Sequence, residues 1–464
     1  PNLATIGPTL TVTCPLYMSP SMLVNVAPGK HGAIRAKSVS VAHATSIGAF
    51  TSNALLISML LPHAQDYFSR KRRFARTISI SGVNAYREQF SLDPRVAYLN
   101  HGSFGVVPKI VAQAQREFQM LEESNPNLFF RTTLPKLHDE ARAFVAEWLG
   151  TTPELFAFVP NASQGVITAA SALVTKPRSQ IVATSLGYGG VLNGLAEIAR
   201  RTQSTLRIAE VDFATGAQTA EDIADSVFAA LTNETTLVVL DQITSETALL
   251  LPIDQIVRTI RRVSPNARVV IDAAHAPGML TPALPADFDV WVGNFHKWIC
   301  APRASAGLVC RTSEIASQMM PLAPSWDFEA GFPKSFFSQG TDDYSSYLAT
   351  PHAIRFHESL RANQLDDHNR RVVNEAAEML QTHWGTEQVV PTEISCPWMR
   401  LVQLPLKKQL TKPECDALTL KISQDLKTET VIVPPGDATY VRLSAFIYNE
   451  STDYEKLKLI DLNS

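Results

Sequence analysis

The 464-residue sequence has few cysteines, no long apolar run and none of the common nucleotide-binding motifs. Its five cysteines are scattered and form no C-x-x-C pair, so they do not indicate a disulfide framework, and we expect an intracellular protein. The longest mainly apolar stretch, residues 54–61, is too short for a membrane-spanning helix of ~20 residues. The Walker A motif and the G-x-G-x-x-G motif of Rossmann domains are also missing. These absences argue against a secreted disulfide-bonded domain, a membrane-spanning protein and the usual nucleotide-dependent enzymes.

Acidic residues are missing from residues 1–65, and a basic cluster, Arg70–Arg73, follows shortly afterwards. A basic, Ser-rich and acid-poor segment is typical of an organelle transit peptide. A disordered leader, or an upstream stretch wrongly joined to the gene, would have the same composition. We therefore expect residues 1–80 to be a leader outside the folded body. The location would be mitochondrial if the leader is a transit peptide and cytoplasmic otherwise.

The overall composition is that of a globular enzyme-sized protein. Hydrophobic residues make up 45% and charged residues 18%, which is enough apolar material for a sizeable core. At roughly 150 residues per domain, the chain is long enough for about three domains, or for one large and one small domain with extensions. The net charge of −3 gives no reason to expect a nucleic-acid partner.

From residue 155 onward, short apolar runs alternate with helical stretches. Unbroken runs of Val, Ile and Leu are typical of strands buried on both faces. Strands separated by helices form right-handed βαβ units, so we predict the α/β class with a mostly parallel sheet. Ligands of such sheets bind beyond the carboxyl ends of the strands. Strands are predicted at 155–159, 180–183, 206–209, 236–240, 268–271 and 290–292, and helices at 161–174, 190–201, 219–232 and 253–263.

Three of these strands are followed by residues that could bind a cofactor or take part in catalysis. Asn161, Ala162 and Ser163 open a helix whose free N–H groups can hold a phosphate, although an ordinary helix cap has the same sequence. Asp272 ends the fifth strand, and Lys297, 25 residues later, follows the sixth; alone, it could be a surface lysine. Together they fit pyridoxal phosphate (PLP), which needs a lysine for covalent attachment, an acid for its pyridine nitrogen and a helix start for its phosphate.

Seven sequence blocks, in family order, resemble those of the class V aminotransferases, which are PLP enzymes of fold type I. Within this family, the chain resembles the branch of isopenicillin N epimerase, hercynylcysteine sulfoxide lyase and cysteine desulfhydrase. The resemblance covers residues 93–460. The blocks are Ala97–Gly105, Pro160–Ser163, Asp241–Ser245, Ile271–Gly278, Asn294–Lys297, Gly340–Asp343 and Val441–Ser444.

The resemblance implies a domain plan and a partner. A large PLP-binding domain with a mostly parallel seven-stranded sheet is expected at 111–350, after an N-terminal arm at 81–110. A smaller α+β domain is expected at 351–464. The family pattern also implies a homodimer with composite active sites and a small-molecule amino-acid substrate. From the net charge and the short apolar runs, we expect no nucleic-acid or membrane partner.

Matching the motifs residue by residue implies roles around the cofactor. Lys297 matches the lysine that attaches the cofactor, Asp272 the partner of the pyridine nitrogen, and His275 the position facing the ring hydroxyl. Tyr188 matches the aromatic residue stacked on the ring, with an ordinary loop tyrosine as the alternative. These four residues are the expected catalytic set. Further cofactor contacts are expected from Ala162, Ser163, Asn294 and His296 and, across the subunit interface, from Gly340 and Thr341.

Other matched residues concern the substrate. Arg442 matches the arginine that holds the substrate α-carboxylate, a planar bidentate task for which guanidinium is suited. Asn100, His101 and Arg131 are expected on the substrate side, although turns and helix surfaces use the same residue types. No residue is assigned to a metal. Gln242 departs from the family pattern, in which His is frequent, and this departure bears on the substrate.

Several reactions can follow once Lys297 takes the Cα proton of a bound amino acid. A sulfur leaving group at Cβ gives elimination, opposite-face reprotonation gives epimerisation, and reprotonation at the cofactor gives transamination. Desulfuration needs a mobile cysteine, but Cys300 and Cys310 lie in apolar stretches and Cys14 in the leader, which leaves Cys396 open. We expect a C–S lyase that releases pyruvate and ammonia, with an epimerase as the alternative, followed by an aminotransferase or a desulfurase.

We predict that a shortened chain starting at Val83 folds, binds PLP and keeps its turnover, because residues 1–80 lack the strand–helix alternation of the body. The visible absorbance of the bound cofactor and the specific activity measure this, with the full chain as control. An insoluble or colourless product would mean that the leader packs on the body.

Overall fold

The computed structural model describes residues 83–174, 176–211, 213 and 219–462, all within one unit of the chain, His63–Ser464. The expected leader at 1–80 lies outside the described residues. Within the described part of the chain, no helix has both the length and the apolar character needed to cross a membrane.

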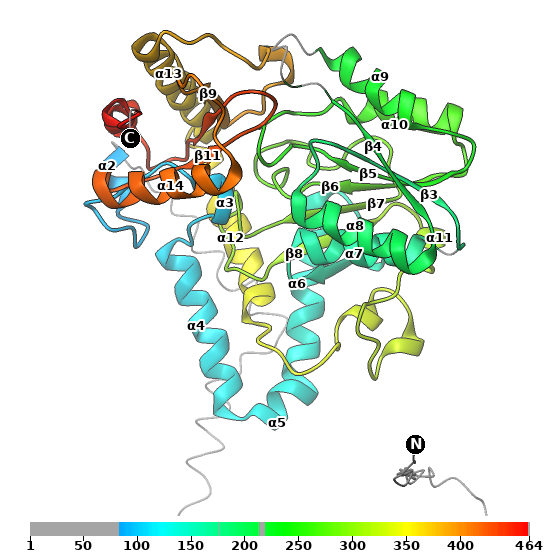
Figure 1. The fold of residues 1–464 in the computed structure, drawn as a ribbon. Coiled ribbons are helices and arrows are strands. Elements are labelled where there is room, and N and C mark those ends of the chain that lie inside the picture. Colours follow the sequence, from blue (N-terminus) through cyan, green and yellow to red (C-terminus); the bar gives the residue numbers. More distant parts are fainter. Residues whose placement is uncertain (1–82, 175, 212, 214–218, 463–464) are drawn as a thin grey trace, which may run out of the picture. The chain divides into compact units, whose positions relative to one another are not determined.

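A seven-stranded sheet forms the centre of the fold (Figure 1). Its strand order is β2-β8-β7-β6-β5-β3-β4. Strand β8 runs antiparallel to both of its neighbours, and all other neighbouring strands pair in parallel. The predicted α/β class with a mostly parallel sheet is therefore confirmed. The strands are β2 Phe156–Val159, β3 Gln180–Thr184, β4 Thr205–Ala209, β5 Thr235–Asp241, β6 Arg268–Asp272, β7 Val290–Asn294 and β8 Ala306–Cys310.

The six strands and four helices predicted from the alternation are confirmed to within three residues at each end. Strand β8 is not among them. It follows β7 without an intervening helix and contains Gly307, so neither the alternation nor strand propensity marks it. The turn between β7 and β8, which carries Lys297, is the place where the parallel order of the sheet is interrupted.

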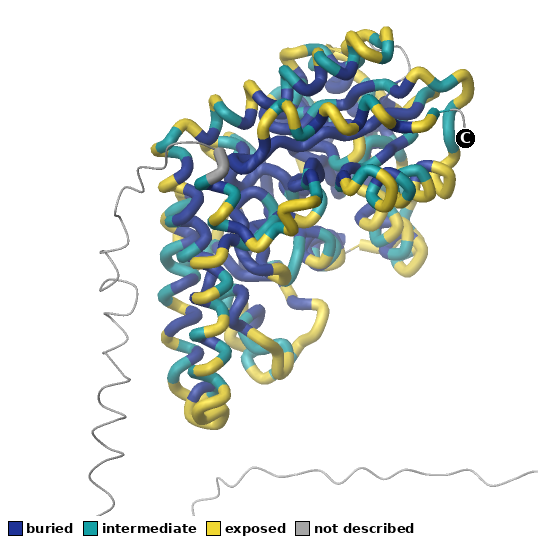
Figure 2. Tube along the Cα trace, turned by 90° about the vertical axis from the view of Figure 1, so that its left-hand side faces the viewer, coloured by how far each residue is buried: buried dark blue, intermediate teal, exposed yellow. Residues whose placement is uncertain are grey.

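Helices cover both faces of this sheet, and for this reason its strands are apolar without alternation (Figure 1). Along the paired strands, Trp291 and Ile271 belong to one buried cluster, whereas Val290 and Val270 belong to the other. Figure 2 shows buried residues along the strands and exposed residues on the outward helix faces. One face is covered by α7 Ala162–Leu173, α8 Gly189–Thr202 and α11 Ser313–Ala316, and the other by α6 Leu134–Leu149, α9 Ala220–Ala230, α10 Ile253–Val263 and α12 Ser345–Arg361.

The C-terminal part has a separate three-stranded antiparallel sheet with its own buried cluster. Its central strand, β12 (Tyr440–Ser444), pairs with both β9 and β11. Mixed strands and helices agree with the α+β domain implied by the resemblance, but the boundary expected at 350/351 falls inside α12 and remains a proposal. The other elements are β9 Met399–Gln403, β11 Val431–Val433, α13 Leu365–Trp384 and α14 Lys412–Leu426.

The first described segment joins this C-terminal part. Strand β1 pairs in parallel with β10, although the two lie more than 300 residues apart in the sequence. The short helix α3 directly follows β1 and leads toward Lys297, as described below. The bounds are α2 Val83–Arg87, β1 Ala97–Tyr98, α3 His101–Phe104, α4 Lys109–Ser124, α5 Pro126–Leu128 and β10 Thr428–Glu429.

Candidate active site

Lys297 lies in the turn after β7, three residues beyond the last strand residue. Its Nζ atom lies 2.9 Å from Nε2 of His275, which follows β6. Burial lowers the pKa of Lys297 to about 7, and the positive charge of Arg442 acts in the same direction. The carboxylates of Asp272 and Asp241 oppose this shift. Near neutral pH, much of Lys297 is therefore an uncharged amine, the form that attacks a carbonyl carbon.

The buried carboxyl groups of Asp241 and Asp272 lie next to each other and act on this amine. The register of β5 and β6 pairs Asp241 with Asp272 at the carboxyl ends of both strands. Burial raises the pKa of Asp272 to about 6, whereas burial and the charge of Asp272 raise the pKa of Asp241 well above its usual range. With a pKa of about 6, Asp272 carries a negative charge at neutral pH, and this charge disfavours ionisation of Asp241. This charge suits the protonated pyridine nitrogen of PLP.

Asp241 is missing from the predicted site residues, although the sequence does mark it. It is the last residue of an apolar strand, as Asp272 is, and therefore lies at the edge where ligands of parallel sheets bind. The main-chain N–H of Tyr188 donates a hydrogen bond to its carboxyl group. Asp241 thus holds the loop that carries the predicted ring-stacking residue.

The start of α7 has main-chain N–H groups that can bind an anion. Oδ1 of Asn161 accepts a hydrogen bond from the Gln164 N–H at 2.9 Å, and Oδ1 of Asn294 accepts from the Ala162 N–H at 2.8 Å. Ser163 has no hydrogen-bond partner among the described residues for its N–H or its hydroxyl. Ser163 is therefore the position at this helix start that remains available to a phosphate.

Two predicted phosphate contacts, Asn294 and His296, already have protein partners. The carbonyl oxygen of the Asn294 side chain is occupied by the start of α7, which ties β7 to this helix. Nδ1 of His296 lies 3.2 Å from the main-chain oxygen of Ser305, and burial lowers the pKa of His296 to about 4. Both predictions stay open for the remaining polar atoms, Nδ2 of Asn294 and Nε2 of His296.

Arg442 is a buried cation without an acidic partner among the described residues. It lies in the central strand β12 and is only 3% exposed. Its Nη2 donates to Oδ1 of Asn100 at 3.1 Å and to Oγ of Ser103 at 2.7 Å, and its Nη1 donates to the main-chain oxygen of Ser245. Its Nε has no partner within the described residues. A buried guanidinium with a free N–H suits an incoming carboxylate. The structure also brings the predicted residue Asn100 beside Arg442.

His101 is buried against the main chain of Lys297, and both of its ring nitrogens have partners. Its ring stacks on Phe446 with centroids 4.0 Å apart, its Nδ1 lies 2.8 Å from Oη of Tyr448, and its Nε2 lies 3.1 Å from the main-chain oxygen of Lys297. The end of the same helix also approaches the lysine turn closely. Gly105 has φ of +63°, and a Cβ atom there would lie 2.0 Å from the main-chain oxygen of His296, so this position requires glycine. In this structure His101 thus supports the main chain of the lysine turn, and its expected contact with substrate stays a prediction.

Tyr188 lies at the start of α8 and lines a cavity of about 420 Å³. Ser245, whose main-chain oxygen binds Arg442, lines the same cavity. The side chain of Tyr188 is 46% exposed, so it remains free to stack on a ligand. The cavity adjoins both the expected ring-stacking residue and the expected carboxylate-binding group.

Three predicted residues, Arg131, Gly340 and Thr341, lie at the surface. Arg131 is exposed and donates from Nε to Oδ1 of Asn127 at 2.8 Å. Gly340 and Thr341 are also exposed. A role for Gly340 and Thr341 in a neighbouring subunit, and for Arg131 in substrate binding, remains a prediction.

The residues present fit PLP. Around the same strand ends lie an amine of lowered pKa, an ionised acid, a neutral histidine and a helix start. Among the described residues, the helix start has a free N–H and the nearby buried arginine has no acidic partner. Among the described residues, no group of three or more His, Cys, Asp and Glu is arranged to hold a metal ion.

The sequence model of the aminotransferase class-V family matches residues 98–414. The chain belongs to this family. The L-cysteine desulfhydrase of Arabidopsis thaliana is 27% identical to this class V protein over 405 residues, 78% of this chain and 86% of the relative. The isopenicillin N epimerase of Amycolatopsis lactamdurans is 25% identical over 403 residues, 82% of this chain and 98% of the relative. The predicted branch is thereby confirmed.

Solved structures agree with this assignment. The cystine C–S lyase C-DES in complex with cysteine persulfide matches with a TM-score of 0.65 at 18% identity, over 78% of this chain and 96% of that chain. A C-DES variant with glycine covalently linked to its PLP cofactor matches with the same TM-score over 80% of this chain and 97% of that chain. The protein is thus a PLP-dependent class V enzyme of fold type I.

We predict that Lys297 is the residue that binds PLP covalently, because its amine is buried beside His275 and Asp272. Borohydride reduction of the holoenzyme followed by peptide mapping should place the pyridoxyl group on Lys297. Lys297→Ala should abolish the label, whereas Lys334→Ala, in an outer turn, should leave it unchanged. A label on another lysine would contradict the assignment.

We predict that Arg442→Lys raises KM for the amino-acid substrate by about 10- to 100-fold, because lysine keeps the charge but loses the bidentate fork. The visible spectrum of the bound cofactor should not change. Arg400→Lys is the matched control, since Arg400 lies in the neighbouring strand β9 and donates to main-chain oxygens. An unchanged KM in Arg442→Lys would mean that Arg442 has a structural role only.

Proposed function

We propose that this class V enzyme is a C–S lyase that acts by β-elimination on a cysteine-type amino acid or cysteine conjugate. The products are pyruvate, ammonia and a sulfur compound. The observation that carries the proposal is that two buried basic groups occur in the same site. Lys297 is an amine of lowered pKa, and Arg442 is an arginine that has no acidic partner among the described residues.

PLP, when bound, supplies an electron sink for the Cα atom of an amino acid. Arg442 would hold the α-carboxylate through its guanidinium and thereby orient the Cα–H bond. Lys297, as a neutral amine, would accept the Cα proton. With sulfur at Cβ, the electron pair of the broken C–H bond forms a double bond as the sulfur leaves. The resulting enamine hydrolyses to pyruvate and ammonia.

Desulfuration is a less suitable reaction for this chain, because it needs a thiolate that reaches the substrate sulfur. The four described cysteines, Cys300, Cys310, Cys396 and Cys415, are all buried, and burial raises the pKa of each thiol. Cys396, which the sequence leaves open, donates to the main-chain oxygen of Met399 at 3.7 Å. Cys14 lies outside the described residues.

Epimerisation is the second candidate, because two relatives are isopenicillin N epimerases. It needs a proton donor on the face of Cα opposite to Lys297, and none of the matched sequence blocks marks such a donor. Transamination would need a site that serves two substrates in turn, and nothing in the sequence indicates one. Elimination needs only the residues already described, which is why we rank it first.

We predict that the holoenzyme releases pyruvate from at least one cysteine-derived thioether or sulfoxide. A lactate-dehydrogenase-coupled assay over such substrates measures this, and Lys297→Ala should lose at least 100-fold in rate. Chiral analysis of the same amino acids provides the comparison. Inversion at Cα without pyruvate would reverse the ranking in favour of the epimerase.

A further inference from the structure

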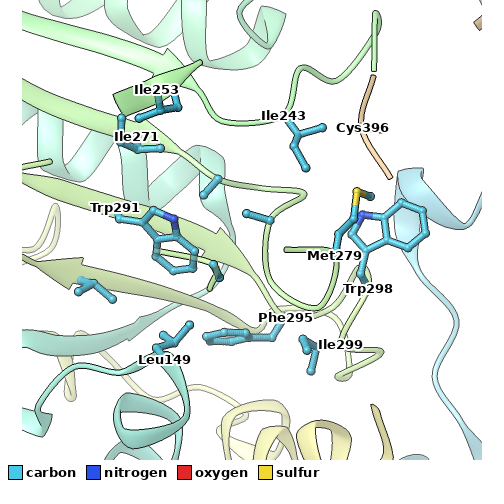
Figure 3. Packing of buried hydrophobic residues seen from close by; sticks show 14 of the residues in the cluster. Leu149, Ile243, Ile253, Ile271, Met279, Trp291, Phe295, Trp298, Ile299 and Cys396 are labelled. Carbon is cyan, nitrogen blue, oxygen red and sulfur yellow. The ribbon is translucent and has the colours of Figure 1, made fainter. Parts of the chain in front are cut away.

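Trp298 directly follows the proposed cofactor lysine and is fully buried. Its Nε1 donates a hydrogen bond to Nδ1 of His275 at 3.3 Å, and Nε2 of the same imidazole lies 2.9 Å from Nζ of Lys297. The three side chains therefore form a chain of hydrogen bonds that runs from the indole through the imidazole to the amine. Figure 3 shows Trp298 beyond the end of the strand that carries Trp291.

The direction of the protons in this chain follows from the chemistry of tryptophan. An indole N–H is a donor only, so Nδ1 of His275 must present its lone pair. A neutral imidazole carries a single proton, which must then lie on Nε2. The Nε2–H group points to Nζ of Lys297, and only an uncharged amine has a lone pair to accept it, because an ammonium group has none.

We propose that Trp298 is a positioning residue whose indole N–H fixes His275 as the Nε2-protonated tautomer, so that His275 donates to the lysine amine and stabilises its uncharged form. Trp298 itself touches neither substrate nor the reacting amine. Its effect reaches the site through the imidazole alone.

The surrounding charges support the neutral state of both groups. Lys297, Arg442 and His296 all disfavour a proton on His275, whose burial lowers its pKa well below the ordinary value. Lys297 faces Arg442 from β12 and the acids Asp272 and Asp241 from β6 and β5, of which the arginine disfavours and the acids favour its charge. A doubly protonated imidazole is therefore not expected here. The tautomer of His275 then decides whether its Nε2 donates a hydrogen bond to Lys297 or accepts one from it.

The indole is also held too firmly to turn away. It packs edge-on against Trp398 with ring centroids 5.4 Å apart and lies 5.0 Å from the ring of His101. A Cβ atom on Gly102 would lie 3.2 Å from the indole ring. A residue that supported only the core would not need its N–H aimed at His275. Trp398, for example, is equally buried, but its Nε1 has no hydrogen-bond partner in the described part of the chain.

The chain therefore offers a matched pair of variants. Trp298→Phe removes an N–H group that bonds His275, and Trp398→Phe removes one that bonds nothing, at the same loss of buried volume. The full-length enzyme is freed of its cofactor, and the rate of PLP capture is measured as a function of pH through its absorbance. This rate follows the fraction of uncharged Lys297, and the midpoint of the wild-type profile is expected near pH 7.

In Trp298→Phe, Nε2 of His275 can lose its proton to Nδ1 and accept from the lysine ammonium instead. The midpoint should then rise by about half to one pH unit, which slows capture at pH 7 by about two- to fivefold. The rates of all three proteins should converge above pH 9, because Lys297 is then uncharged in each of them. Trp398→Phe should keep the wild-type midpoint. Equal midpoints in both variants would overturn the proposal.

A second measurement reads the tautomer in the wild-type chain and does not depend on the Trp298→Phe protein. Nitrogen NMR of the wild-type chain with labelled histidine, free of PLP, reports which ring nitrogen carries the proton, and His275→Gln identifies the signal. A proton on Nε2 is expected. A proton on Nδ1 would overturn the proposal whatever the Trp298→Phe protein does.

Discussion

An amine can remain uncharged near neutral pH inside a protein only when burial and nearby cations outweigh nearby acids. Around Lys297, burial and Arg442 act against the charged form, while Asp272 and Asp241 act for it. The charge of Asp272 in turn raises the pKa of Asp241, its partner in the register of the two strands. The balance depends on Arg442, Asp272 and Asp241 together, and a change at any one of them would alter the charge of the lysine.

The fold brings this balance about by joining segments that are far apart in the sequence. Strands β5, β6 and β7 deliver the two acids and the lysine to one edge of the large sheet, while β12 of the small sheet delivers Arg442. The block at residues 97–105 binds both parts, since Asn100 contacts Arg442 and His101 contacts the main chain of Lys297. The arginine and the lysine are thus held in place by one shared segment.

Membership of the class V family and a PLP cofactor make a carbanion at Cα of an amino acid the common starting point of the possible reactions. The choice among reactions then depends on what surrounds the lysine. The described thiols are buried and held in their protonated form, and the cavity beside Tyr188 leaves space for a substrate side chain. These features agree better with elimination of a sulfur group than with transfer of sulfur to a protein thiol.

The sequence by itself determined six of the seven strands of the large sheet and the family, and it predicted Lys297 as the cofactor lysine, because buried parallel strands leave unbroken apolar runs and their ends carry the chemistry. It did not reveal β8, which has no preceding helix, or the pairing of Asp241 with Asp272, which depends on strand register. Contacts such as Arg442 with Asn100, 342 residues apart, arise only when the chain folds, because local sequence carries no record of them. The same holds for the bond between Trp298 and His275: adjacency in sequence placed the indole beside the lysine, but only tertiary packing aimed its N–H at the imidazole.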